Sequence, residues 1–262
     1  DPVEPNRVYF AGGTYMNNPA ALFASDDYGD TWTRYDVPFH CGGNQSGRGC
    51  GERMRVNPNN NKEVWFGSRD SGLWKTEDYG KNWEEVTSFP VTGNYKQESN
   101  NIGILWVEFD PASTDLYVGV AMTDGQCIYK SADGGESWTA LPANAKGMYP
   151  LHASFSTEGK LYLAYSDNCG PNLSPTDGAV CVYDPKTDSF TDITPDLKDG
   201  RQGGFGGISV DAQNPDTLVV STLGWWSDNG DNLYYSKDGG KSWSGLFNLS
   251  TKETNYQMDT SE

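Results

Sequence analysis

Ser131-Ala132-Asp133-Gly134-Gly135-Glu136-Ser137-Trp138 is the stretch that decides the fold, because near-copies of it recur along the chain. The other intact copies occupy residues 25–32, 76–83 and 236–243, and a decayed copy occupies 184–190. Counting the decayed copy, the spacing is roughly fifty residues, and a fixed period of this size indicates one supersecondary unit repeated around an axis.

Each copy predicts a tight hairpin turn. Its Asp carboxylate can accept hydrogen bonds from backbone amides two residues on, and the Gly that follows can take a positive φ. The Trp at its end starts the return strand and supplies a large ring for packing against the next unit. A catalytic role for these Asp residues is disfavoured, since a catalytic pair is needed once per protein whereas the turn recurs in every unit.

The segments around the turns read as strands. In one unit, short apolar runs cover residues 54–58, 64–67, 72–75 and 83–86, which predicts four antiparallel strands. Four-stranded units at this period are typical of β-propeller blades, each of which buries a face on its neighbour. The sequence therefore predicts an all-β fold, a propeller of four-stranded blades with Asp-box turns. The expected blade repeats are about 1–38, 52–90, 103–142, 150–195 and 204–247.

The two ends of the sequence suggest an excerpt. The first unit enters at the turn between its first two strands, and a polar tail follows the last unit at residues 248–262. Natural proteins avoid an unpaired blade edge, because it invites aggregation. We therefore expect residues 1–262 to be a partial propeller, although a ring of five complete blades stays open.

The charge of the chain bears on its partners. It has 36 acidic and 19 basic residues, a net charge of −17. Such a surface repels polyanions, so neither nucleic acid nor an anionic membrane is expected as a partner. No apolar stretch approaches the roughly 20 residues of a membrane helix. We expect a secreted, extracellular protein with a neutral substrate.

The five cysteines sit in a suggestive pattern. Cys41 and Cys50 bracket one glycine-rich loop, Cys169 and Cys181 bracket another, and Cys127 is left over. In an oxidising compartment this predicts two local disulfides, with five unpaired thiols as the alternative. Only two histidines are present and no pair has metal-ligand spacing, so neither a metal nor another cofactor is expected.

Two features stand out from the scaffold. Adjacent indoles at Trp225 and Trp226 follow a strand, and exposed aromatic rings stack on the apolar faces of sugars. The alternative is that both rings pack between blades. The second feature is the glycine-dense loop 41–53, which can bring the side chains of Asn44, Arg48, Glu52 and Arg53 to one place. Its alternative is an internal Arg–Glu pair that fixes a blade connection.

These residues carry a resemblance to a known family. Residues 38–58, Pro-Phe-His-Cys-Gly-Gly-Asn-Gln-Ser-Gly-Arg-Gly-Cys-Gly-Glu-Arg-Met-Arg-Val-Asn-Pro, resemble the Gly-Gly-Asn…Gly-Arg…Gly-Glu-Arg-Leu-Ala-Val-x-Pro signature of glycoside hydrolase family 74 xyloglucanases. Further similar segments lie at 72–80, 87–90, 103–110, 161–165, 191–195, 206–211 and 225–226. They follow the family's order and span essentially the whole chain.

The resemblance implies a fold and an activity. It implies two tandem seven-bladed propellers with a cleft between them, of which this chain would form about five blades of the first. It also implies cleavage of β-1,4-glucan bonds in xyloglucan with inversion, which needs a carboxylic acid and a carboxylate roughly 6.5–9.5 Å apart. In the family the base lies upstream of the position that matches Asp1, and the acid lies in the second propeller. We therefore expect no catalytic residue in this chain, which alone would be inactive although it is part of an enzyme.

The resemblance also implies binding residues. Trp225 and Trp226 match paired tryptophans that stack on glucan, although Ser227 stands where the family usually has Pro. Asn44, Arg48, Glu52 and Arg53 match signature positions, for which we expect a cleft-shaping role. His152 matches the last position of the family's Pro-His-His, in which this chain has Leu151. The expected partners are xyloglucan or a related β-glucan and the second propeller of the same protein.

Two other classes stay open. A sialidase-like hydrolase shares such turns but needs an arginine cluster for the substrate carboxylate. Of the seven arginines, three (Arg48, Arg53, Arg55) lie in one short segment. A non-catalytic β-propeller module that binds carbohydrate or protein fits the scaffold equally well.

Overall fold

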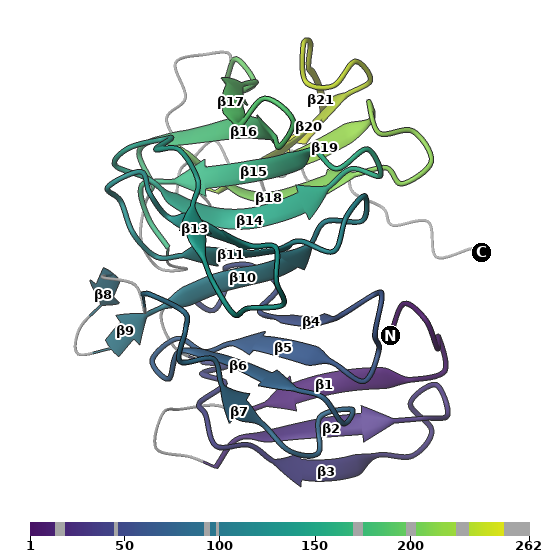
Figure 1. Cartoon of the computed structure of the whole chain (residues 1–262). Helices are drawn as coiled ribbons and strands as arrows, with labels where there is room; N and C mark the ends of the chain where they lie inside the picture. Colours follow the sequence, from purple (N-terminus) through teal and green to yellow (C-terminus); the bar gives the residue numbers. More distant parts are fainter. Residues whose placement is uncertain are drawn as a thin grey trace.

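The regular elements of the described chain are all β-strands. The computed structural model describes residues 1–13, 19–44, 47–91, 95–97, 100–169, 175–197, 203–223 and 231–248. Within these ranges the strands form antiparallel sheets in which neighbours in sequence are neighbours in the sheet (Figure 1). The predicted all-β class is confirmed. None of the described residues forms a helix long and apolar enough to cross a membrane.

Five sheets follow one another along the chain, with a small hairpin between the second and third (Figure 1). Sheet one has three strands, β1 (Val8–Gly12), β2 (Ala21–Ser25) and β3 (Thr33–Asp36). Sheet two contains β4 (Met54–Val56), β5 (Val64–Gly67), β6 (Leu73–Thr76) and β7 (Glu84–Glu85). The hairpin pairs β8 (Tyr95–Gln97) with β9 (Asn100–Ile102).

The remaining three sheets have four strands each. Sheet three contains β10 (Ile104–Phe109), β11 (Leu116–Val120), β12 (Ile128–Ser131) and β13 (Thr139–Ala140). Sheet four contains β14 (Tyr149–Phe155), β15 (Leu161–Ser166), β16 (Gly178–Asp184) and β17 (Ser189–Asp192). Sheet five contains β18 (Gly204–Val210), β19 (Leu218–Leu223), β20 (Asn232–Ser236) and β21 (Ser244–Asn248).

The core lies between the inner strands of successive sheets. The first strands of sheets two to five contact one another in order: β4 contacts β10, β10 contacts β14, and β14 contacts β18. The second strands β5, β11 and β15 are buried along their whole length. A strand covered on both faces reads as a continuous apolar run rather than an alternating one, which explains sequences such as Leu-Tyr-Val-Gly-Val. The fourth strands lie at the solvent side.

The recurring turns are held by their own Ser and Asp side chains. In the third copy, the Ser131 hydroxyl donates to Asp133 (2.8 Å) and accepts from the Gly135 amide (2.8 Å). The Asp133 carboxylate accepts from the backbone amide and the hydroxyl of Ser137, at 2.9 and 2.6 Å. The other intact copies repeat these contacts at 25–31, 76–82 and 236–242. The amide bound by the Asp is thus four residues on, not two as we expected.

These hydrogen bonds favour the charged form of the turn carboxylates. They lower the pKa of Asp27, Asp133 and Asp238 to about 2, chiefly through the hydroxyl of the residue four positions on. Because these pKa values lie below the unfolded value, the stabilisation is present above about pH 4 and is lost as the pH falls towards 2. Groups that hold their charge so firmly are poor proton donors.

The decayed fourth copy makes its turn with different contacts. The Tyr183 hydroxyl donates to Asp188 (2.7 Å), and the Lys186 amide donates to Asp184 (2.9 Å). Phe190 stands in the position of the missing Trp and packs on Tyr183, with ring centroids 4.9 Å apart. The unit therefore keeps a hairpin and an aromatic contact without the Ser and Asp network.

The tryptophan after each turn packs backwards, not forwards as we expected. Trp83 meets Phe39 edge-on at 5.0 Å between ring centroids, and Phe39 lies on the segment that leaves sheet one. Trp138 meets Phe89, on the segment that leaves sheet two, at 4.8 Å. Each turn therefore fastens its own sheet to the chain that exits the preceding one.

Trp32 is the exception among these indoles. Its side chain is 44% exposed, because no sheet of the described residues precedes sheet one and covers it. Its indole nitrogen still donates to the Gly29 carbonyl within the turn (2.9 Å). The expected packing of the indole on a neighbouring unit is therefore not seen for the first copy among the described residues.

The second turn glycine is required twice over. Gly135 has φ +89°, which a side chain rarely adopts, and a Cβ there would lie 2.5 Å from Cη2 of Trp65 in sheet two. Its neighbour Gly134 has φ +69°, but a Cβ there would meet nothing within 4 Å. Comparing the two glycines therefore separates the effect of positive φ, which both share, from the effect of the contact with Trp65, which Gly135 has and Gly134 lacks.

We predict that Gly135→Ala destabilises the protein much more than Gly134→Ala. Both variants carry the cost of a side chain at positive φ, about 1–2 kcal/mol, and Gly135→Ala adds overpacking of roughly 1–3 kcal/mol against Trp65. Urea unfolding followed by far-ultraviolet circular dichroism gives both free energies of unfolding. Equal losses in the two variants would contradict the proposed contact between sheets two and three.

Candidate functional site

The glycine-dense loop 41–53 connects sheet one to sheet two and lies against other sheets. The Gly43 amide donates to the Gly13 carbonyl just after β1 (2.6 Å). At the other end of the loop, the Val107 amide of β10 donates to the Glu52 carbonyl (3.0 Å). Gly51 has φ +47°, and a Cβ there would overlap the Leu105 carbonyl. Only a glycine lets the loop approach sheet three this closely.

His152 on β14 extends these contacts to sheet four. Its Nε2 lies 3.1 Å from the Gly49 carbonyl, and because a carbonyl only accepts, the neutral ring carries its proton on Nε2. Burial is the main cause that lowers the pKa of His152, and the charge of Arg53 lowers it further. The hydrogen bond to Gly49 and the charge of Glu52 oppose this shift. The structure thus brings His152, Glu52 and Arg53 together.

Two positively charged side chains, those of Arg53 and Arg69, lie near each other at the loop. Arg53 donates from Nη2 to the Gly47 carbonyl (3.0 Å), and burial lowers its pKa. Arg69, which follows β5, is 2% exposed. Burial lowers the pKa of Arg69 to about 9, and the positive charges of Arg53 and Arg48 contribute. Arg69 was not predicted from the sequence, in which its only signal is a charged residue two positions after an apolar strand.

Glu52 belongs to an ion pair that crosses from sheet two to sheet three. Arg55 on β4 binds both Glu52 and Glu108 of β10 through its Nη2. Glu108 is buried, and burial raises its pKa to about 7 against the opposing charge of Arg55. The alternative of an internal Arg–Glu pair that fixes a blade connection therefore describes Glu52, with Arg55 rather than Arg53 as its partner.

Four of the predicted binding residues remain: Asn44, Arg48, Trp225 and Trp226. Asn44 and Arg48 are exposed on the loop. Trp225 and Trp226 lie outside the described residues, in the connection between β19 and β20. The close arrangement seen in the structure is therefore that of Glu52, Arg53 and His152 around the loop.

The structure does not form the predicted disulfides. All five cysteines are free and buried. Cys41 packs with Ala20, Phe39 and Phe66, whereas Cys50 lies in a separate hydrophobic cluster. That second cluster also holds Cys127, Cys169 and Cys181. Cys41 and Cys50 are close in sequence but lie in different clusters, so the structure does not bring this predicted pair together, whereas Cys169 and Cys181 share a cluster.

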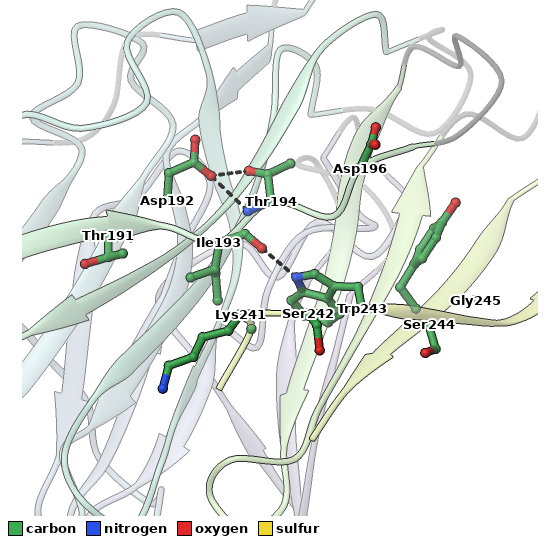
Figure 2. A pocket seen from close by; sticks show the side chains of 12 residues that line it. Thr191, Asp192, Ile193, Thr194, Asp196, Lys241, Ser242, Trp243, Ser244 and Gly245 are labelled. Carbon is green, nitrogen blue, oxygen red and sulfur yellow. Dashed lines mark hydrogen bonds between the residues drawn. The ribbon is translucent and has the colours of Figure 1, made fainter. Parts of the chain in front are cut away.

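A separate hollow of about 1070 Å³ lies between sheets four and five (Figure 2). Trp243 lines it and donates from its indole nitrogen to the Ile193 carbonyl (2.7 Å). Asp192 accepts from the Thr194 amide (2.9 Å) and hydroxyl (2.5 Å). The Trp243 bond joins sheet five to the exit of sheet four, and the Asp192 bonds fold that exit segment on itself. The hollow is therefore a crease between sheets, and loop 41–53 does not line it.

Comparison with known proteins places the chain. Residues 20–174, more than half of it, match the family model Sortilin-Vps10, described as sortilin, neurotensin receptor 3. The chain belongs to the Sortilin-Vps10 family. The individual proteins that the chain resembles have more specific names than this family.

A xyloglucanase of Paenibacillus sp is 43% identical over 94% of this chain, which covers 26% of that relative. An oligoxyloglucan-reducing end-specific xyloglucanase of Emericella nidulans is 39% identical over 96% of the chain, which covers 34% of it. The crystal structure of the GH74 xyloglucanase from Xanthomonas campestris matches with a TM-score of 0.86 and 36% identity, over 94% of this chain and 37% of that one. The resemblance to glycoside hydrolase family 74 is confirmed, and the chain spans about a quarter to a third of the curated relatives.

The buried Glu108 predicts a specific pH dependence. Because its folded pKa of about 7 exceeds the unfolded value of 4.5, its stabilisation is complete below pH 4.5 and is lost as the pH rises through 7. We expect the melting temperature to fall between pH 5 and 8, by an amount that corresponds to at most ~3 kcal/mol. Glu108→Gln should flatten this fall, whereas the exposed Glu84→Gln should not. Identical pH profiles for wild type and Glu108→Gln would contradict the assignment.

Proposed function

We propose that this chain supplies scaffold and glucan-binding surface to a secreted, inverting glycoside hydrolase that cleaves β-1,4-glucan bonds in xyloglucan. The observation that carries the proposal is the identity of 36–43% to xyloglucanases over 94% of the chain. Identity at this level along nearly the whole chain, in the order of the family signature, supports a shared substrate class.

The fold enters the proposal as part of a propeller. We propose that the five sheets are consecutive blades of a seven-bladed ring, with Asp-box turns between the third and fourth strands and blade repeats at the predicted ranges. The stepwise contacts from β4 to β10, β14 and β18 support a common axis. A second propeller of the same protein would face this one and complete the cleft.

The binding surface follows from the order of the strands. In an antiparallel blade, the connection between strands two and three and the connection to the next blade emerge at the same edge of the sheet. Loop 41–53 is a connection between sheets, and residues 224–230 connect the second and third strands of sheet five. We propose that Trp225, Trp226, Asn44, Arg48 and His152 serve the glucan on this face, away from the Asp turns.

The catalytic carboxylates are proposed to lie outside this chain. The turn carboxylates Asp27, Asp133 and Asp238 have pKa values of about 2, which is the opposite of what a general acid needs. Glu108 has the raised pKa of a general acid, but it is buried and bound to Arg55. Its environment fits the joint between two sheets better than proton transfer to a polymer.

The test is turnover of tamarind-type xyloglucan by the full-length protein and its Trp225→Ala, Trp226→Ala double variant. Each stacked ring contributes on the order of 1–3 kcal/mol, so we expect at least a tenfold loss of kcat/KM with unchanged circular dichroism. The control is Trp32→Ala, which removes an exposed indole from the opposite face and should keep full turnover.

Two outcomes would contradict the proposal. If the double variant unfolds, the rings belong to the core between blades and do not form a sugar platform. If the full-length wild type binds xyloglucan without cleaving it, the chain belongs to a non-catalytic binding module.

A further inference from the structure

Two cysteines that are far apart in sequence meet in the core. The Cys50 thiol donates to the carbonyl of Cys169 at 3.2 Å, across 119 positions of sequence. The two residues are 3% and 1% exposed and belong to the same hydrophobic cluster. Cys50 lies in the loop that precedes sheet two, and Cys169 lies shortly after β15 of sheet four.

The side chains of Cys50 and Cys169 also interact with each other. This contact is the main cause that lowers the pKa of Cys50, and the charges of Arg53 and Arg69 act in the same direction. Burial, together with the same sulfur contact, raises the pKa of Cys169. One member of the pair is thus prepared to become a thiolate, which is the nucleophile in disulfide chemistry, and the other lies beside it.

The remaining cysteines have other surroundings. Cys41 packs in a different hydrophobic cluster, and burial raises its pKa to about 11. Burial likewise raises the pKa of Cys127 to about 12 and that of Cys181 to about 11. We therefore choose Cys50 and Cys169 as the reactive pair because they are in contact, and not because of their spacing in the sequence.

We propose that Cys50 and Cys169 form a disulfide that ties loop 41–53 to the end of sheet four. The bond replaces the two local disulfides expected from spacing and leaves Cys41, Cys127 and Cys181 reduced. The inference goes beyond the proposed activity and does not depend on it, because it concerns only the covalent structure of this chain.

The oxidant is a small disulfide of the glutathione class. The Cys50 thiolate attacks one sulfur of that disulfide, forms a mixed disulfide and releases one thiolate. The Cys169 thiolate then attacks Sγ of Cys50, forms the Cys50–Cys169 bond and releases the second small thiol. Two protein thiols are oxidised to the disulfide, one small disulfide is reduced to two thiols, and the two protons lost by the protein thiols end on those two small thiols.

Burial determines when the bond can form. Since both sulfurs are covered in the folded chain, an oxidant reaches them during folding or when loop 41–53 opens. Once formed, the bond closes a loop of more than a hundred residues, which restricts the unfolded chain strongly. We expect the melting temperature to rise by roughly 10 °C relative to the reduced protein.

The test is peptide mapping of protein refolded in a mixture of oxidised and reduced glutathione, then alkylated. Trypsin cleaves after Arg48, which separates Cys41 from Cys50. A protease that cleaves before aspartate separates Cys169 from Cys181 at Asp177. We expect one cross-linked species that joins the Cys50 and Cys169 peptides, with the other three cysteines alkylated.

Variants link the bond to stability. Cys50→Ser and Cys169→Ser should each abolish the cross-link and the rise in melting temperature, whereas Cys127→Ser and Cys181→Ser should keep both. Dithiothreitol should return the wild type to the value of Cys169→Ser. A link between Cys41 and Cys50 or between Cys169 and Cys181, or alkylation of all five cysteines, would overturn the proposal. The map of the wild type decides this even if a variant fails to fold.

Discussion

The contact on which the structure depends is the close approach of an Asp turn to the sheet before it, which three of the four intact turns make among the described residues. Where the second turn glycine sits, a Cβ would collide with a side chain of the preceding sheet or its exit segment. Among the described residues these pairs are Gly80 with Leu22, Gly135 with Trp65, and Gly240 with Ile193. The turn is therefore both the end of one hairpin and the surface on which the neighbouring unit packs. A sequence that repeats this turn repeats the interface between sheets with it.

Close approach of the backbone at glycine positions also explains how a loop can be held between several sheets. Loop 41–53 contacts sheets one, three and four through Gly43, Glu52 and Gly49, and its glycines allow backbone to lie directly on backbone. Next to the loop, Arg55 on β4 binds both Glu52 and Glu108. The raised pKa of Glu108 and the lowered pKa values of the turn aspartates change the stability of the fold in different pH ranges. Glu108 loses its stabilisation as the pH rises, and the turn aspartates lose theirs as the pH falls.

Local chemistry was readable from sequence, whereas contacts between distant segments were not. The all-β class and the turns follow from short-range rules, since Ser, Asp and Gly act within eight residues of one another. The direction in which Trp83 and Trp138 pack, the burial of Arg69, and the meeting of Cys50 with Cys169 depend on how sheets are stacked. Spacing alone pairs each cysteine with its sequence neighbour, and it gives no sign that Cys50 meets Cys169.

Amide hydrogen exchange tests the central contact most directly. The amides of Gly80, Gly135 and Gly240 donate to buried Ser or Thr hydroxyls against a neighbouring sheet. The Gly29 amide makes the same bond, but its turn packs on no described sheet. The account predicts exchange at the first three as slow as in β11, and clearly faster exchange at Gly29. Equally fast exchange at all four glycines would contradict it.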